Sequence, residues 1–163
     1  TSAEVSFLKA EIYNRGIGRV AANPALAKQY YEEGVTESVK FWYGLANGSS
    51  IWQVNKPAAT PTALELSTML ANPAVAYSAT PSTALEQIYK QSWIAFFHQP
   101  LEAWNLQRRT GGKTPAEALS PSSPVLNFNK LIYPTSETES NYDNWKAVTG
   151  GTNDEKVKPW FMP

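Results

Sequence analysis

The sequence predicts a mainly α-helical chain. Apolar residues recur at helical spacing in three segments, at about 2–15, 24–43 and 82–111. Helix start and stop signals bracket these segments, including Asn23-Pro24 before the second and Gly111-Gly112 after the third. The remaining residues are rich in proline, serine and glycine, which favour loops. With 163 residues, of which 42% are hydrophobic, the chain is long enough for one globular region.

The first expected helix runs from about Ser2 to Arg15 and ends at the Gly16-Ile17-Gly18 break, since glycine supplies the left-handed cap of a helix. Its apolar residues form two adjoining faces, Val5, Leu8 and Ile12 on one and Ala3, Phe7 and Ala10 on the other. Such a helix requires partners on both sides. The chain also begins without Met, so we expect a cleaved or truncated product whose N-terminal portion packs here. The alternative is a shortened form of a complete small domain.

The second expected helix begins with Asn23 as N-cap and Pro24 at the first helical position. It ends at Phe41 or Tyr43, and Gly34 is a weak point that costs about 1 kcal/mol relative to alanine. Together the first two helices form an antiparallel hairpin over residues 1–43. Residues 44–81 are expected to be a loop-rich insertion, with an aromatic plug at Ile51-Trp52 and one short helix at about 62–71.

One long helix is expected over residues 82–111. Thr83 and Glu86 form a capping-box pattern, which makes Thr83 the expected N-cap. An apolar stripe follows at Leu85, Ile88, Tyr89, Ser92, Trp93, Phe96 and Phe97. Pro100 should bend this helix, and both Trp93 and Trp104 are expected to pack in the core. Residues 112–163 are expected to form an irregular tail, with a short helix near Glu137 to Asn144.

Composition narrows the possible functions. Fourteen basic and fourteen acidic residues give no net charge, which disfavours nucleic acid as a partner. The absence of cysteine excludes disulfides, thiolate metal sites and thiol nucleophiles. No apolar run approaches the ~20 residues that span a bilayer, and residues 1–4 lack the features of a signal peptide.

Catalytic signals are weak. Glycoside hydrolysis requires a pair of carboxylates, and accidental pairs are available among Glu102, Glu137, Glu139, Asp143, Asp154 and Glu155, but none lies in a distinctive motif. The only histidine, His98, is interpreted as a packed or surface residue rather than a general base. The acidic segment 136–144 lacks the spacing of a calcium loop, so it is interpreted as a solvated turn. We therefore expect no enzyme activity, no catalytic residue, no metal and no cofactor.

Several short motifs occur in an order that resembles one family. They are EVSFLKAE at 4–11, YYEEGVTES at 30–38, the segment 85–111 with LEAW and Arg108-Arg109, Tyr133-Pro134 followed by Glu137 and Asn141, and Lys158-Pro159-Trp160. Their order is similar to that in the C-terminal part of SusD/RagB-like proteins, and the form of the 85–111 segment is most similar to the SusD-like branch. The resemblance spans nearly the whole chain. Two departures are Lys130, near a position where many relatives have arginine, and Trp160-Phe161 in place of a tryptophan pair.

The resemblance implies tetratricopeptide-like helix pairs with a loop-rich C-terminal region, as part of a larger α-superhelical protein. It implies a Bacteroidetes lipoprotein at the outer membrane, on the cell surface, anchored by lipid through an N-terminal segment outside these residues. Such proteins act as lids on a SusC-like TonB-dependent transporter and capture oligosaccharides or peptides. The resemblance makes the remaining N-terminal portion of the same protein a further expected partner. It also explains the two apolar faces of the first helix, because helical repeats bury their surfaces against neighbouring repeats.

Sugar binding needs exposed aromatic rings beside amides and hydroxyls. The candidate ligand-binding residues are Trp42, Tyr43, Asn47, Trp52, Gln53 and Asn55. The alternative is that the three rings pack against the core. Arg108 and Arg109 suit the end of a helix, and one of them is expected to pair with Glu137 or another carboxylate.

Three hypotheses remain from the sequence. The first is a binding module for nutrient capture, the second a non-catalytic scaffold that docks the transporter, and the third a glycosidase. Aromatic rings exposed together in one concavity would favour the first. A flat surface with buried rings would favour the second, and a carboxylate pair in a deep cleft the third.

Overall fold

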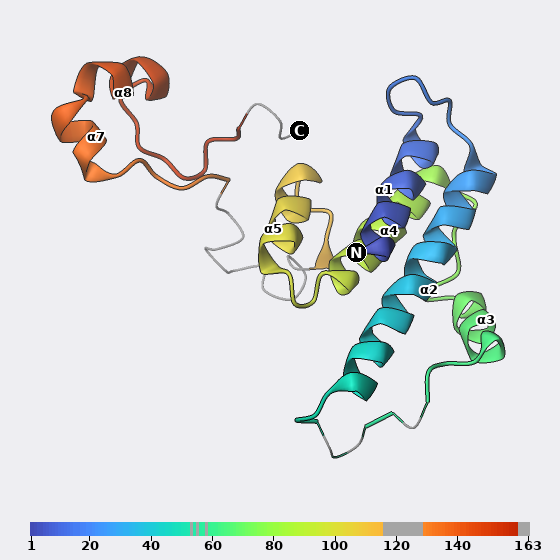
Figure 1. Ribbon diagram of the computed structural model, residues 1–163. Helices are drawn as coiled ribbons and strands as arrows, with labels where there is room; N and C mark the ends of the chain where they lie inside the picture. The colour runs from blue at the N-terminus through green and yellow to red at the C-terminus, as the bar shows by residue number, and fades with distance from the viewer. Residues whose placement is uncertain (53, 55, 58, 116–128, 160–163) are drawn as a thin grey trace. The chain divides into compact units, whose positions relative to one another are not determined.

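The computed structural model describes residues 1–52, 54, 56–57, 59–115 and 129–159, and every regular element in them is a helix (Figure 1). The helices are α1 (Ser2–Arg15), α2 (Pro24–Gly48), α3 (Ala63–Ala71), α4 (Pro81–Ala95), α5 (Pro100–Arg109), α7 (Thr135–Ser140) and α8 (Tyr142–Thr149). The mainly α-helical prediction is confirmed. The chain divides into two compact units, Thr1–Ala103 and Trp104–Pro163, and each is described by itself.

Helices α1 and α2 form an antiparallel hairpin at the start of the first unit (Figure 1). Thr1 and Glu4 form a capping box at the N-terminus of α1, and Gly16 ends the helix in the left-handed region with φ 68°. The Asn23 side chain accepts a hydrogen bond from the Leu26 backbone N–H at 3.1 Å, which caps α2. The start of α2 and the end of α1 therefore follow the expected signals, and α1 begins at Ser2 as expected.

The core of the first unit lies where α1 packs against α2 and α4. Its largest fully buried side chains are Tyr31 of α2 and Ile88 of α4, and Phe7 of α1 is also buried. Burial of each such side chain contributes about 1.5–3 kcal/mol to folding. Gly34 allows this close packing, because a Cβ atom built there would lie 2.7 Å from Phe7 Cε1.

Helix α1 buries one of its two apolar faces. Ala3, Phe7 and Ala10 are at most 2% exposed, whereas Val5 and Leu8 are 51% and 46% exposed. The second face thus has no partner that covers it in the described part of the chain.

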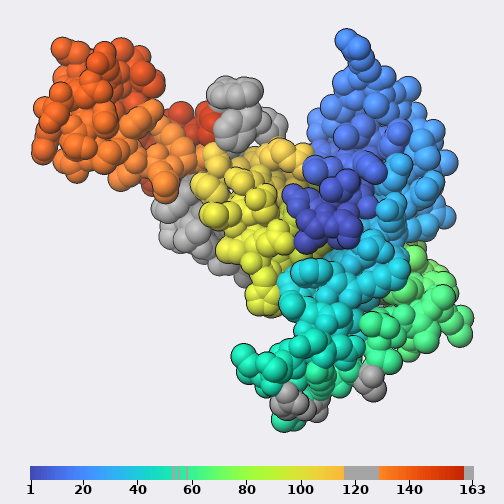
Figure 2. Space-filling model, viewed as in Figure 1, coloured from blue at the N-terminus to red at the C-terminus, as the bar shows by residue number. Residues whose placement is uncertain are grey.

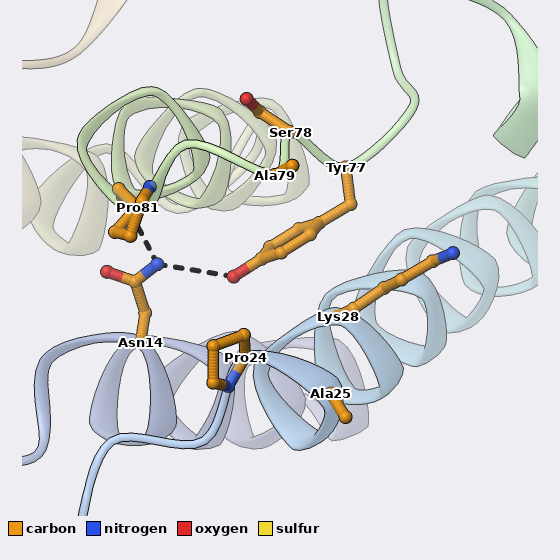
Figure 3. Close-up of a pocket in the computed structure, with 8 residues that line it drawn as sticks. All are labelled: Asn14, Pro24, Ala25, Lys28, Tyr77, Ser78, Ala79 and Pro81. Carbon is orange, nitrogen blue, oxygen red and sulfur yellow. Dashed lines mark hydrogen bonds between the residues drawn. The ribbon is translucent and has the colours of Figure 1, made fainter.

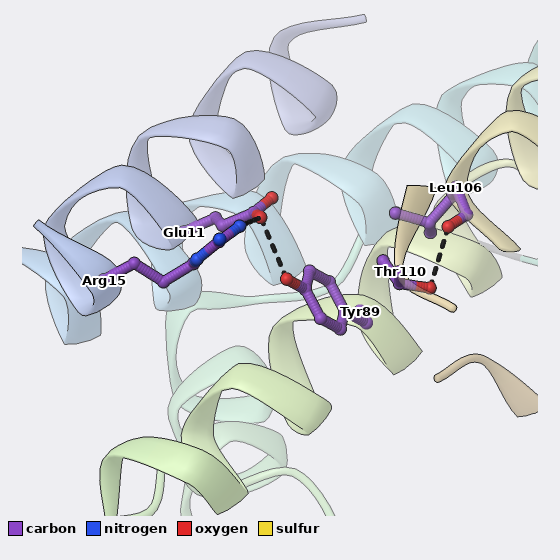
Figure 4. A network of polar contacts seen from close by, with 5 residues as sticks. All are labelled: Glu11, Arg15, Tyr89, Leu106 and Thr110. Carbon is purple, nitrogen blue, oxygen red and sulfur yellow. Dashed lines mark hydrogen bonds and ion pairs between the residues drawn. The ribbon is translucent and has the colours of Figure 1, made fainter. Parts of the chain in front are cut away.

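A buried carboxylate joins α1 to α4 (Figure 4). Glu11 is 3% exposed, and its Oε1 accepts hydrogen bonds from Arg15 Nη1 at 2.8 Å and from Tyr89 Oη at 2.9 Å. The hydrogen bond to Glu11 raises the pKa of Arg15. Charge-assisted hydrogen bonds of this kind satisfy a carboxylate that would be costly to bury alone.

Two expected helix ends were wrong. Helix α2 continues past Tyr43 to Gly48, so the loop-rich segment begins five residues later than expected, and Gly44 lies within the helix. Helix α4 begins at Pro81 after Thr80, so Thr83 lies in its first turn and is not the N-cap. Proline at the first helical position has its φ angle already set for a helix, which accounts for the earlier start. The short helix expected at about 62–71 is present as α3, with a capping box between Thr62 and Glu65.

The long helix expected over 82–111 is interrupted. Helix α4 ends at Ala95 and α5 begins at Pro100, because proline lacks the N–H that a continuous helix needs at that position. The apolar stripe is buried only as far as Phe96, and Phe97 is 77% exposed. Trp93 and Trp104 are half-buried, so the expectation that both lie in the core was wrong.

The second unit holds α7 and α8, where one short helix was expected near Glu137 to Asn144. Trp145 of α8 is the largest buried side chain among the described residues of this unit, at 8% exposed, and Gly150 ends α8 with φ 68°. The Thr110 hydroxyl donates to the Leu106 carbonyl at 2.8 Å at the end of α5 (Figure 4). Among the helices of the described residues, none has both the length and the apolar character needed to cross a membrane.

Candidate functional site

An exposed aromatic cluster lies in the first unit, where the second half of α2 meets the residues that follow α4. We call it the Trp42 cluster, and it consists of Phe41, Trp42, Phe97 and His98. The Trp42 ring centroid lies 6.1 Å from that of Phe97 and 5.1 Å from that of His98. The Phe97 and His98 rings are 4.8 Å apart. The contacts thus join residues that are more than fifty positions apart in the sequence.

The break between α4 and α5 positions half of this cluster. The Phe97 N–H donates to the Ile94 carbonyl at 3.2 Å, and the Gln99 N–H donates to the Phe96 carbonyl at 2.7 Å. These tight turns replace the regular hydrogen bonds of an α-helix just before Pro100. As a result the Phe97 and His98 rings lie against Trp42 rather than in the core.

The cluster combines accessible ring surface with one polar ring. Phe97 is 77% exposed and Phe41 44% exposed, and Trp42, whose ring contacts both, is half-buried. The interplanar angles of Trp42 with Phe41 and Phe97 are 80° and 83°, an edge-to-face arrangement that aromatic rings prefer. The imidazole of His98 adds hydrogen-bonding nitrogens at the edge. This arrangement suits ligands with both apolar C–H faces and hydroxyl groups.

Tyr43, although adjacent to Trp42, lies in a different place. It lines a cavity of about 330 Å³ with Val39 of α2, Leu66 and Met69 of α3, and residues of the segment before α3. Figures 1 and 2 show the end of α2 and helix α3 side by side in this region. Glu65 also lines the cavity, and hydrogen bonds from the backbone and hydroxyl of Thr62 lower the pKa of that carboxyl.

The other candidate binding residues are not gathered into one group. Asn47 is half-buried in the last turn of α2. Trp52 is 47% exposed, and its backbone N–H donates to the Ser49 hydroxyl at 3.0 Å. Gln53 and Asn55 lie outside the described residues. Of the four candidates that the structure describes, only Trp42 belongs to the aromatic cluster, whereas Phe97 and His98 were not among the predicted binding residues.

The family-motif residues have structural contacts within the second unit. The Arg108 guanidinium lies 4.2 Å from the centre of the Trp104 ring, a cation–π contact, and Arg109 is exposed. Glu137 accepts a hydrogen bond from the Asn141 side chain at 2.8 Å.

The Tyr133-Pro134 motif precedes α7. Its backbone is held by Asn153, which accepts from the Tyr133 N–H and donates to the Tyr133 carbonyl, both at 2.9 Å. Pro134 is the N-cap residue of α7. These contacts give both residues a role in holding the loop before the helix.

No metal centre is found in the part of the chain that the structure describes. Its His, Cys, Asp and Glu side chains form no group of three or more that could hold a metal ion.

Comparisons with known proteins place the chain in a family. A family model of SusD-like proteins, described as starch-binding and associating with the outer membrane, matches residues 1–134. A SusD-like structure from Bacteroidetes, AC2a, is 25% identical with a TM-score of 0.69, over 100% of this chain and 30% of that one. A SusD homologue from Bacteroides vulgatus is 25% identical with a TM-score of 0.56, over 98% and 34%.

This chain therefore spans about a third of the length of these two solved relatives. No curated protein matches it. Since the family model covers most of the sequence, the chain belongs to the SusD-like family.

Proposed function

We propose that the protein captures oligosaccharides at the cell surface, as the partner of a SusC-like TonB-dependent outer-membrane transporter. The observation that carries the proposal is the match of residues 1–134 to a family described as starch-binding and associating with the outer membrane. In this proposal a lipid anchor and the remaining helix pairs belong to an N-terminal portion outside these 163 residues. These residues contribute a helical surface and an aromatic contact site.

The Trp42 cluster is the proposed contact site for sugar. A pyranose ring has apolar C–H faces that can pack on a flat aromatic ring, and Phe97 offers such a face at 77% exposure. The His98 imidazole can exchange hydrogen bonds with ring hydroxyls. Trp42 contacts both rings, since its centroid lies within 6.1 Å of each.

Affinity electrophoresis of the full-length protein against a panel of polysaccharides and peptides tests the proposal. We expect retardation by at least one glycan, and about a five- to tenfold loss of affinity in Phe97→Ala and Trp42→Ala, which corresponds to about 1–1.4 kcal/mol for a lost ring contact. Leu64→Ala is the matched control, because Leu64 is an apolar side chain of α3 with a similar exposure of 75%. It should bind as the wild type does.

The outcomes separate the hypotheses. Retardation by no glycan would refute sugar capture, and retardation by peptides alone would support a peptide-capturing member of the family. If glycans bind equally well to Phe97→Ala, Trp42→Ala and Leu64→Ala, the Trp42 cluster is not the contact site. Purification of the tagged protein from detergent extracts of the native membrane tests the proposed partnership. We expect a TonB-dependent transporter to co-purify, and purification of the protein without such a transporter would contradict the partnership.

A further inference from the structure

Asn47 and Gly48 form the only Asn-Gly pair in the 163 residues, and they lie in the last turn of α2. This end of α2 leads into the segment before α3 (Figure 1). An asparagine can react with the backbone nitrogen of the next residue, because that nitrogen and the side-chain carbonyl carbon can close a five-membered ring. Glycine favours this reaction, since it has no Cβ atom to hinder the approach. The pair is therefore a candidate site of chemical modification.

The Asn47 side chain is not held in place. Among the described residues it makes no hydrogen bond, and it is half-buried. Asn14 of α1 is the opposite case, because its side-chain nitrogen donates to Tyr77 Oη and to the Pro81 carbonyl, both at 3.2 Å, beside a cavity of about 310 Å³ (Figure 3). The Asn14 amide is therefore fixed, whereas the Asn47 amide is free to rotate towards the Gly48 nitrogen.

A regular helix slows this reaction, because its hydrogen bonds occupy the backbone N–H groups and its geometry fixes the backbone angles. The last turn of α2 is weakly held. Gly44 and Gly48 both lower its helix propensity, and it contains no basic residue to interact with the helix dipole. The C-cap Ser49 is extended instead of left-handed, and its N–H donates to the Ala46 carbonyl at 3.3 Å. A helix end of this kind frays more easily than one with a glycine cap.

Space is available for this turn to open. A Cβ atom built at Gly44 or at Gly48 would meet nothing within 4 Å, and Gly48 is exposed. No packed neighbour therefore blocks these two positions, and water has access to the Asn47-Gly48 pair.

We propose that Asn47 is a site of spontaneous deamidation. The Gly48 backbone nitrogen loses its proton and attacks the side-chain carbonyl carbon of Asn47. The bond from that carbon to the side-chain nitrogen breaks, and the nitrogen takes up a proton and leaves as ammonia. The product is a cyclic imide, and water then adds to one of its two carbonyl carbons and opens the ring. The result is aspartate or isoaspartate at position 47, and no ligand or enzyme is needed.

The modification changes the end of α2. It places a carboxylate at the C-terminus of a helix, where the helix dipole disfavours negative charge. In isoaspartate the main chain also contains one additional carbon atom, which interrupts the regular spacing of helical hydrogen bonds. The modified protein should therefore lose the last turn of α2. This inference is independent of the proposed function, because both reacting groups belong to the chain.

Peptide mapping by mass spectrometry tests the inference on the full-length protein, sampled over time in a mildly alkaline buffer. We expect first-order loss of the Asn47 amide and two product peptides of equal mass, one with aspartate and one with isoaspartate. Asn23 and Asn72 are internal controls, since each precedes proline, which has no N–H to react. Gly44→Ala should slow the loss about two- to fivefold, because alanine strengthens the last turn of the helix.

A parallel incubation in urea isolates the contribution of the helix. There the wild type and Gly44→Ala should lose the Asn47 amide at the same rate, since neither keeps α2. Four results would overturn the inference. They are retention of the Asn47 amide, equal rates for the wild type and Gly44→Ala in native buffer, a difference between them that persists in urea, and a Gly48→Ala variant that reacts as fast as the wild type.

Discussion

Replacing Gly34 by alanine tests the close packing of α1 on α2. The new Cβ atom would lie 2.7 Å from Phe7 Cε1 and 2.8 Å from Cδ1, whereas carbon atoms in contact are normally about 3.5–4.0 Å apart. Phe7 is 2% exposed, so its ring has no open space to move into. Overpacking of this kind costs about 1–3 kcal/mol, and the better helix propensity of alanine offsets about 1 kcal/mol of it. We expect the free energy of unfolding to fall by up to about 2 kcal/mol.

Gly44 in the same helix provides the opposite case. A Cβ atom there would meet nothing within 4 Å, so Gly44→Ala should raise the free energy of unfolding by about 0.5–1 kcal/mol. Urea unfolding followed by circular dichroism measures both variants. In a Phe7→Val background, which removes the three clashing ring atoms, Gly34→Ala should become neutral or stabilising. If Gly34→Ala is as stable as Gly44→Ala in the wild-type background, the close approach of α1 to α2 is refuted.

The remaining predictions concern polar groups of the first unit. Tyr89→Phe removes one donor to buried Glu11 and should lower the free energy of unfolding by about 1.5–3 kcal/mol in the same urea assay; no change would contradict the network. Burial raises the pKa of Tyr31 to about 12 from about 10 in the unfolded chain, so its contribution to stability is complete below pH 10 and is lost as pH rises towards 12. An absorbance titration in which all tyrosines ionise near pH 10 would disprove this. Because Thr62 lowers the pKa of Glu65, the pair stabilises the fold above the ordinary pKa of Glu, and this contribution is lost as pH falls through the lower value. Thr62→Val should raise the Glu65 midpoint in an NMR titration, and an unchanged midpoint would argue against the capping box.

Local signals in the sequence predicted the start of α2 and the end of α1 well. The Asn23-Pro24 pair and the left-handed Gly16 determine their boundaries through contacts within a few residues, so they can be recognised without knowledge of the fold. The end of α2 was harder to predict, because Gly44 costs only about 1 kcal/mol in a helix and the rest of α2 can outweigh it. The same local reasoning underestimated Pro100, which separates two helices rather than bending one.

The aromatic cluster could not be predicted from linear spacing. Trp42 meets Phe97 and His98 only because α4 packs against α1 and α2, and no pattern in the sequence encodes that pairing.

The contact between Trp42 and His98 also gives this protein a chemical label of its own. His98 is the sole histidine, it is exposed, and its ring centre is 5.1 Å from that of Trp42. Within these 163 residues, a reagent that acylates imidazoles therefore modifies histidine at one position only, and the mass increase measured there reports whether the cluster is covered. Protection of that position by a glycan, a peptide or a transporter would show which of them occupies the surface, without any substitution in the protein.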